Sequence, residues 1–442
     1  MSIMRSWMVW PLILAGVMAV ALARPAWARG PRPTGGLDVG CREEGAAGAL
    51  RRAPGRAHDE NWTSVADGVN DTVFALATSG PGLYVGGQFE EMTDDTGTTE
   101  VDFIAKWNGK AWESLADGVN ERVWAITPDG SDMLVGGWFT QATDEQGIHV
   151  VNHIARWSGE GWTPLGGGVD GGVAAIAVSG SDVYVGGFFS QAMDGNGDKI
   201  AVNNIARWDG HTWSALGEGL SGPSDRYVSV TSIAVSGADV YVGGAFTTAT
   251  DADGTKTVNN IARWDGRRWS ALGGGTNDYV YAVATQGTDV FVGGQFTSIA
   301  EALGATPAKG IARWSGSAWQ PVGGGLTFGI APGRVYALKV ERDGLYVGGD
   351  FTQALDGAGA KDAYFIVRWD GAAWQPLAGG VNGSVMALAT RGVTVYAGGA
   401  FNAAGAEEAR CVARFRPAGV HADYALYLSH IAGGASPAAR FR

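Results

Sequence analysis

Histidines and cysteines are the first residues to consider for metal or nucleophilic chemistry in this 442-residue chain. Six histidines are present, and His149 and His153 lie four residues apart. No cysteine or further histidine stands close by to complete a tetrahedral metal site. The sequence also contains no Gly-x-Ser-x-Gly elbow and no phosphate-binding loop. These patterns favour a protein that is not an enzyme.

Acids, amides and glycines alternate in several loops. The clearest cases are Asp194, Asn196 and Asp198 in one loop and Asp251 and Asp253 in another. Oxygen ligands spaced in this way suit Ca²⁺, although no copy supplies the distal bidentate glutamate of an EF-hand loop. Asp, Asn and Gly are equally typical of tight turns. A Ca²⁺ site and a plain turn therefore both remain open for these loops.

An internal repeat of about fifty residues carries these loops. Each copy contains a Val-x-Ala-Leu-like segment, a Val-Gly-Gly-x-Phe segment and an Ile-Ala-Arg-Trp segment, which is degenerate and ends at Phe415 in the last copy. In the other six copies a second tryptophan follows five residues later. The Val-Gly-Gly-x-Phe segments end at Phe89, Phe139, Phe189, Phe246, Phe296, Phe351 and Phe401. Short β-branched and aromatic segments between Gly, Asp, Asn and Ser are typical of strands joined by hairpins. Four such strands per repeat predict an all-β protein, a seven-bladed β-propeller with four-stranded antiparallel blades.

The two ends of the repeat region complement each other. Trp62 has the context of an outer-strand tryptophan but no third-strand partner before it, and Phe415 ends a third strand with no outer strand after it. We therefore expect the N-terminal outer strand to pair with the C-terminal blade, which removes an exposed sheet edge.

The double glycine and the tryptophan that follows at a fixed distance resemble the kelch repeats of the galactose oxidase central-domain superfamily. The resemblance covers residues 62–416, and Arg-Trp-Asp replaces the usual Tyr-Asp. This variant is more similar to the repeats of fungal cortical-marker ectodomains and of bacterial secreted propellers. It implies a fold, and it does not transfer the copper-radical chemistry, because Cys41 lies outside the blades and Cys411 lies in a core strand.

The repeated glycines and tryptophans are interpreted as packing residues. Glycine inside a strand admits a close neighbour, and we expect tryptophan rings of the adjacent sheet to be that neighbour. Trp124 and Trp138 break the pattern, because they stand where other repeats carry Ala, Gln, Phe or Asp. They are the candidate ligand-binding residues.

The N-terminus has the pattern of a secretory signal peptide over residues 1–28, with Arg5 before an apolar stretch and Ala26-Trp27-Ala28 at its end. The remaining regions are an irregular extension at 29–60, the propeller at 61–416 and a tail at 417–442. Export makes a disulfide between Cys41 and Cys411 the expectation, with two unrelated thiols as the alternative.

The mature chain is acidic. Its net charge is −14, because removing residues 1–28 takes two arginines and no acids from a chain of charge −12. Such a surface repels nucleic acid and anionic lipid. We expect a secreted, monomeric, non-catalytic module that is not an integral membrane protein and binds an extracellular protein or glycan. The alternatives are a secreted carbohydrate-active enzyme with a site at the central mouth and a Ca²⁺-dependent adhesion domain.

Overall fold

The computed structural model describes Cys41 and residues 61–223, 227–301 and 304–417. These belong to one compact unit, Val39–Arg442. The predicted signal peptide, most of the predicted N-terminal extension and the predicted tail after residue 417 lie outside the described residues. Every regular element of the described part is a β-strand. No helix in this part is long and apolar enough to cross a bilayer.

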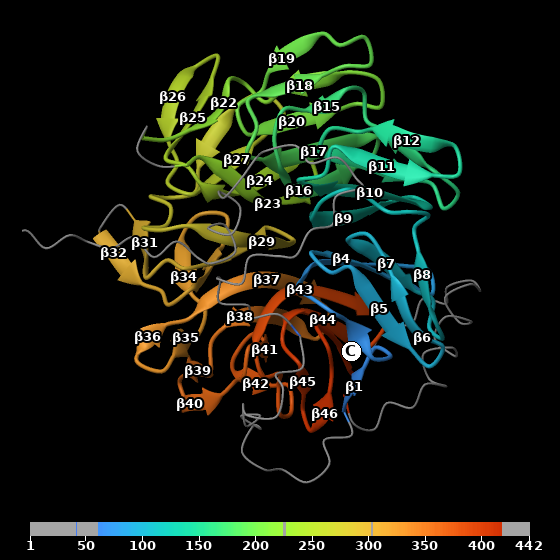
Figure 1. Cartoon of the computed structure of the whole chain (residues 1–442). Coiled ribbons are helices and arrows are strands. Elements are labelled where there is room, and N and C mark those ends of the chain that lie inside the picture. The colour runs from blue at the N-terminus through green and yellow to red at the C-terminus, as the bar shows by residue number, and fades with distance from the viewer. Residues whose placement is uncertain (1–40, 42–60, 224–226, 302–303, 418–442) are drawn as a thin grey trace, which may run out of the picture. The chain divides into compact units, whose positions relative to one another are not determined.

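The strands form repeated four-stranded antiparallel sheets, and the chain is therefore a β-propeller (Figure 1). We call the strands of a sheet the first, second, third and outer strands, and they follow one another in chain order except in the last sheet, where the outer strand β1 (Trp62–Ser64) comes first in the chain. The first strands are β3 (Val73–Ser79), β9 (Val123–Asp129), β16 (Val173–Ser179), β23 (Ser229–Ser236), β29 (Val280–Gln286), β37 (Arg334–Glu341) and β43 (Ser384–Arg391). The second strands are β4 (Gly82–Gly87), β10 (Asp132–Gly137), β17 (Asp182–Gly187), β24 (Asp239–Ala245), β30 (Asp289–Gly294), β38 (Gly344–Asp350) and β44 (Thr394–Ala400).

The third strands carry the Ile-Ala-Arg-Trp-like segments. They are β7 (Ile104–Trp107), β13 (Ile154–Trp157), β20 (Ile205–Trp208), β27 (Ile261–Trp264), β33 (Ile311–Trp314), β41 (Ile366–Trp369) and β47 (Val412–Phe415). The outer strands are β8 (Trp112–Ser114), β14 (Trp162–Pro164), β21 (Trp213–Ala215), β28 (Trp269–Ala271), β34 (Trp319–Pro321), β42 (Trp374–Pro376) and β1 (Trp62–Ser64).

The loops between second and third strands are themselves hairpins, which the sequence pattern did not predict. They are β5 (Glu91–Asp94) with β6 (Gly97–Glu100), β11 (Gln141–Asp144) with β12 (Gly147–Val150), β18 (Gln191–Met193) with β19 (Lys199–Ala201), β25 (Thr248–Asp251) with β26 (Gly254–Thr257), β31 (Ser298–Glu301) with β32 (Gly304–Pro307), β39 (Gln353–Asp356) with β40 (Gly359–Asp362), and β45 (Ala403–Ala404) with β46 (Glu407–Glu408). Short strands before some of the first strands extend these hairpins: β2 (Gly68–Val69), β15 (Gly168–Val169), β22 (Gly219–Ser221), β35 (Gly325–Phe328) and β36 (Ala331–Pro332).

The repeated glycines allow neighbouring sheets to approach closely. A Cβ added at Gly136 would lie 2.4 Å from Cγ1 of Val173, on the first strand of the next sheet. The same relation joins Gly398 of the last sheet to Val73 of the first, at 2.6 Å. The expectation that tryptophan rings fill this space is wrong, because a valine does. The reason is geometric: these glycines face the adjacent first strand, whereas the tryptophans lie on third and outer strands.

The repeated tryptophans connect neighbouring sheets at their third and outer strands. The two tryptophans of a sheet pack with ring centroids 5.0 to 5.4 Å apart. In most sheets the indole Nε1 of the outer-strand tryptophan donates to a leucine carbonyl of the preceding sheet, as Trp213 does to Leu165 at 3.2 Å. Trp374 differs and donates to Leu355 O at 3.0 Å. Trp112 also differs, because its Nε1 is buried without a hydrogen-bond partner in the described part of the chain. In the other sheets the buried indole N–H finds its acceptor in the neighbouring sheet.

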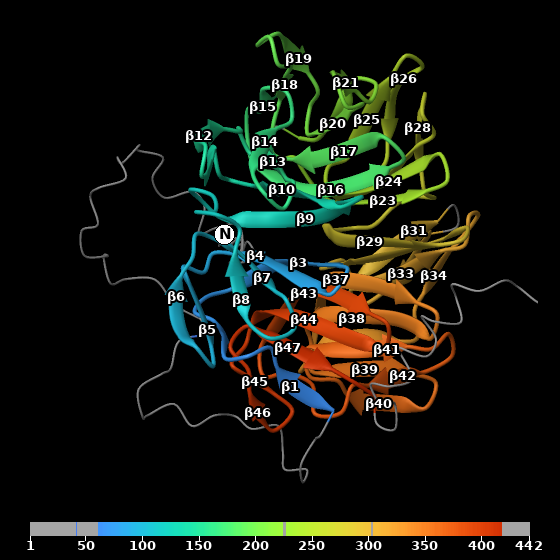
Figure 2. The same cartoon turned by 90° about the vertical axis from the view of Figure 1, so that its right-hand side faces the viewer.

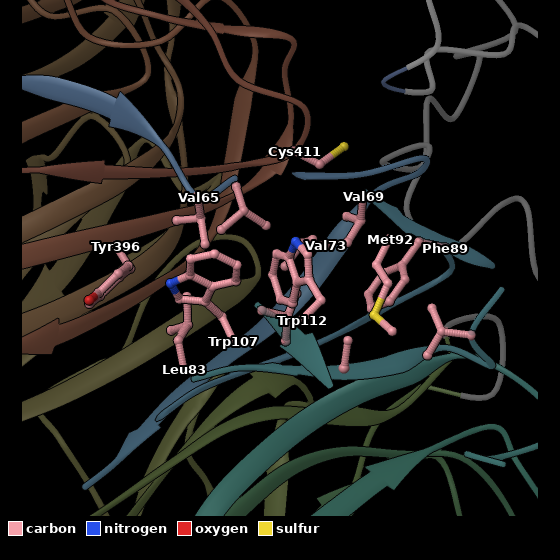
Figure 3. Packing of buried hydrophobic residues seen from close by; sticks show 14 of the residues in the cluster. Val65, Val69, Val73, Leu83, Phe89, Met92, Trp107, Trp112, Tyr396 and Cys411 are labelled. Carbon is pink, nitrogen blue, oxygen red and sulfur yellow. The ribbon is translucent and has the colours of Figure 1, made fainter. Parts of the chain in front are cut away.

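The chain ends meet in the last sheet, where β1 pairs antiparallel with β47, with Trp62 opposite Phe415. Trp62 is fully buried and its Nε1 donates to Leu377 O at 2.9 Å. β3 of the first sheet contacts β43 and β44 of the last, and Figure 2 shows these strands side by side. One buried cluster includes Val73 and Trp107 of the first sheet and Tyr396 of the last (Figure 3).

Cys41 and Cys411 are joined by a disulfide between residues 370 positions apart, with Cα atoms separated by 5.9 Å. Cys411 directly precedes β47, and Figure 3 shows it beside the buried cluster of the first and last sheets. This Cα separation is usual for a disulfide. Its formation in the exported protein stays a prediction for chemical mapping.

Candidate functional site

Each first strand contains a β-bulge near its start, and the bulged residue is the one that varies among the repeats. In β9, for example, Val123 pairs with Gly137 and Ala125 pairs with Gly136, which leaves Trp124 as the extra residue. A bulge redirects a side chain, and bulges are frequent beside functional sites. The bulged residues are Phe74, Trp124, Ala174, Thr231, Tyr281, Tyr336 and Met386.

A second variable residue follows the glycine pair of each second strand, close to the bulge. We call the two positions the variable pair of a sheet. The pairs are Phe74 with Gln88, Trp124 with Trp138, Ala174 with Phe188, Thr231 with Ala245, Tyr281 with Gln295, Tyr336 with Asp350, and Met386 with Ala400. Because the surrounding segments repeat and these positions do not, their side chains are available for a specific role.

Trp124 and Trp138, the two residues singled out from the sequence, contact each other. Their ring centroids lie 5.5 Å apart at an interplanar angle of 77°. Phe188 of the next sheet approaches Trp124 at 6.0 Å, and His153 approaches Trp138 at 5.8 Å. We call Trp124, Trp138, Phe188 and His153 the aromatic cluster. All four side chains are partly exposed, so ring surface remains available to a ligand.

Two polar atoms of the aromatic cluster are buried without a partner in the described part of the chain: Trp138 Nε1 and His153 Nδ1. Burial lowers the pKa of His153, so its imidazole is neutral at pH 7. Unsatisfied buried polar groups are uncommon in folded proteins and carry a cost. The packing of Trp138 against the backbone of Gly172, whose added Cβ would lie 3.0 Å from the indole, fixes this arrangement. Trp138 thus packs closely against the next sheet in spite of that cost.

His149 does not join His153. Its Nε2 lies 2.7 Å from Oδ1 of Asp144 instead, in the hairpin of β11 and β12. That the spacing of His149 and His153 does not mark a metal site stays a prediction. Within the described residues, no group of three or more His, Cys, Asp or Glu side chains is arranged to hold a metal ion.

A second cluster at the variable pairs was not foreseen from the sequence. Tyr281 donates its hydroxyl to Gln295 Oε1 at 2.6 Å, and Tyr336 donates to Asp350 Oδ2 at 2.9 Å. Ser384 of the last sheet also donates to Asp350. The rings of Tyr281 and Tyr336 lie 5.5 Å apart across neighbouring sheets. We call these five residues the tyrosine cluster.

Both tyrosines remain protonated at neutral pH. Burial raises the pKa of Tyr281, and the neighbouring Tyr336 adds to this effect. Burial also raises the pKa of Tyr336, helped by the charge of Asp350 and opposed by Arg334. The two phenols are therefore hydrogen-bond donors throughout the physiological range. The signal that could have found them was the variable residue inside each Val-x-Ala segment.

The acidic loops dock the hairpins onto the outer strands. Asp251 Oδ2 accepts from the backbone N of Trp269 at 2.6 Å and from Lys256 Nζ at 2.6 Å. The same contact recurs in three other sheets, where the backbone N–H of the outer-strand tryptophan donates to Asp94, Asp144 or Asp356. Asp253 forms an ion pair with Arg268, at 2.8 Å. In this hairpin the carboxylates already have protein partners.

The loop at Asp194 lacks this docking. The Asp194 Oδ1 atom accepts hydrogen bonds from the backbone N–H groups of Asn196 and Asp198, at 2.9 and 3.0 Å. This is the geometry of a turn capped by an aspartate side chain. Asn196 and Asp198 are exposed. Ca²⁺ binding at these residues stays a prediction, which melting curves in millimolar Ca²⁺ and in chelator check through the shift that a ligand of the folded state produces.

No family model and no curated protein matches this chain. Solved structures with a similar arrangement of strands include the computationally designed Ika8 protein, 16% identical over 81% of this chain and 100% of that one, with a TM-score of 0.46. YCF48 from Cyanidioschyzon merolae is 13% identical over 81% of this chain and 100% of that one, with a TM-score of 0.47. The WD40 β-propeller domain of Doa1 is 12% identical over 78% and 93%, with a TM-score of 0.47. Because these likenesses are weak, the β-propeller assignment is based on the repeated sheets of this chain.

Proposed function

We propose that the chain is a closed, seven-bladed propeller of the kelch-like kind, exported to the cell exterior, and that it acts there as a non-catalytic binding module. Three relations of the last sheet, one of them with the first sheet, support closure. β1 pairs with β47, Gly398 faces Val73, and Trp62 donates to Leu377 O in the sheet before the last. The strand pairing recurs within the other sheets, and the glycine–valine contact and the indole hydrogen bond recur between neighbouring sheets.

The observation that carries the binding proposal is the aromatic cluster. It unites residues of two neighbouring sheets at positions where other sheets have alanine, such as Ala174 for Trp124 and Ala245 for Trp138. Folding therefore does not require tryptophan at these positions. Partly exposed, rigid aromatic rings are the usual anchors of binding surfaces. The ligand is an extracellular protein or glycan that covers these rings.

Arrays of glycans and of extracellular proteins test the proposal, with the purified chain beginning at residue 29 as the probe. We expect a reproducible ligand whose affinity falls by about tenfold or more in the Trp124→Ala/Trp138→Ala variant, as for truncated aromatic anchors. A variant with an unchanged affinity, or arrays without any ligand, would contradict the proposal. Thr63→Ala, an exposed change on β1, is the matched control.

A further inference from the structure

The tyrosine cluster has a composition that packing alone does not explain. In several other sheets both equivalent positions carry apolar side chains, for instance Met386 with Ala400, and within the described residues no other variable pair combines a tyrosine with a carboxylate or an amide. Placing two phenols and a carboxylate there instead costs desolvation, which their mutual hydrogen bonds only offset. Polar groups kept at such a cost are expected to serve recognition.

The hydrogen-bonding capacity of the cluster is only partly used. Gln295 accepts from Tyr281 through Oε1, and its amide nitrogen has no partner among the described residues. The carboxylate of Asp350 accepts from Tyr336 and Ser384, and two oxygens can accept further bonds. Arg334 lies close enough to Tyr336 to oppose the rise of its pKa. Donors and acceptors of both kinds thus converge beside two aromatic rings.

We infer that the tyrosine cluster is a carbohydrate-binding subsite. A sugar ring offers what these groups complement: adjacent hydroxyls that each donate and accept, and C–H faces that pack on aromatic rings. Asp350 accepts from one hydroxyl, the Gln295 amide donates to a neighbouring hydroxyl, and the Tyr281 and Tyr336 rings cover an apolar face. A neutral sugar fits best, because an anionic one would meet Asp350. This inference rests on the proposed binding function and deepens it by naming the ligand class.

Isothermal titration of the purified chain from residue 29 with a panel of neutral monosaccharides and their methyl glycosides tests the inference. We expect at least one of them to bind. Its affinity should fall about tenfold or more in Asp350→Asn and in Tyr281→Phe/Tyr336→Phe, because each change removes hydrogen bonds in a partly buried site. The phenylalanine variant keeps both rings, and circular dichroism verifies its fold. Gln88→Ala, at the register position of Gln295 in the first sheet, should bind like the wild type.

Two results would overturn the inference. One is the absence of binding by every neutral sugar tested, and the other is sugar binding that neither variant weakens. The failure of the proposed binding function can be distinguished from the failure of the carbohydrate subsite. A protein ligand on the arrays that depends on Trp124 and Trp138, together with no binding of any neutral sugar, would support the binding module and refute the carbohydrate subsite. Arrays without any ligand, together with no binding of any neutral sugar, would refute both.

Discussion

The repeated contacts between sheets and the variable pairs lie within a few residues of each other, yet they are under opposite constraints. Gly136 must remain small because Val173 of the next sheet occupies the space beside it. Trp124, on the neighbouring first strand, occupies a bulge where another sheet has Ala174. The first position stabilises the fold, and the second is free to vary. The residues that pack the sheets together are therefore distinct from the residues of the proposed binding surface.

The largest expected effect comes from removing the strand that joins the chain ends. Deleting residues 59–68 removes β1 with the fully buried Trp62. Loss of such a side chain alone costs about 3–5 kcal/mol, and an open sheet edge adds to this. We expect a large fall in melting temperature or loss of a cooperative transition by circular dichroism. A truncated protein that melts cooperatively at the wild-type temperature would refute the closed propeller.

Removing the disulfide should have the next largest effect on stability. Replacing Cys41 and Cys411 by serine releases a constraint between residues 370 positions apart. The chain-entropy model sets the loss at no more than about 6 kcal/mol. Peptide mapping without reductant should recover the linked peptides from the exported wild type. Two free thiols would show that the bridge does not form, and the propeller would remain intact in that case.

Adding one methyl group at a repeated glycine should lower the free energy of unfolding by about 1–3 kcal/mol. Gly136→Ala places a Cβ 2.4 Å from Val173 Cγ1, whereas Gly195→Ala meets nothing within 4 Å. Chemical denaturation should therefore show Gly136→Ala destabilised and Gly195→Ala close to wild type. Equal stabilities for the two variants would contradict the proposed role of the repeated glycines.

The smallest effect concerns acid stability. Burial opposes ionisation of Asp251, but hydrogen bonds from Lys256, Trp269 and Asp253 outweigh it and lower the pKa. A carboxyl whose pKa is lowered by folding stabilises the native state above its unfolded pKa, near 4, and this contribution is lost as pH falls through the lower folded value. The Asp251→Asn variant should thus melt at a lower temperature than the wild type at pH 7. Its melting temperature should also fall less than that of the wild type when the pH is lowered. Asp194→Asn, without such docking, is the control. Identical pH profiles for wild type and Asp251→Asn would refute this role.

The repeated elements were predictable from the sequence because their residues recur at fixed spacing. The four strands of each sheet, with Trp62 opposite Phe415, follow from that spacing alone. The contact of Trp124 with Trp138 was within reach for the same reason, since both interrupt the repeat. Tyr281 and Tyr336 were not recognised, because their variability within the Val-x-Ala segments is visible in the sequence but the bulge that sets them apart is not. The valine beside each glycine could not be predicted either, since it depends on how neighbouring sheets pack.

One measurement tests the separation of fold and binding most directly: the melting temperature and the dissociation constant of Trp124→Ala/Trp138→Ala and of Gly136→Ala, determined side by side. The account predicts that the tryptophan variant binds its ligand about tenfold or more weakly while melting close to wild type, because alanine occupies both positions in other sheets. It also predicts that Gly136→Ala melts lower but binds normally while folded. A tryptophan variant that unfolds at lower temperature yet binds as tightly as the wild type would contradict the account.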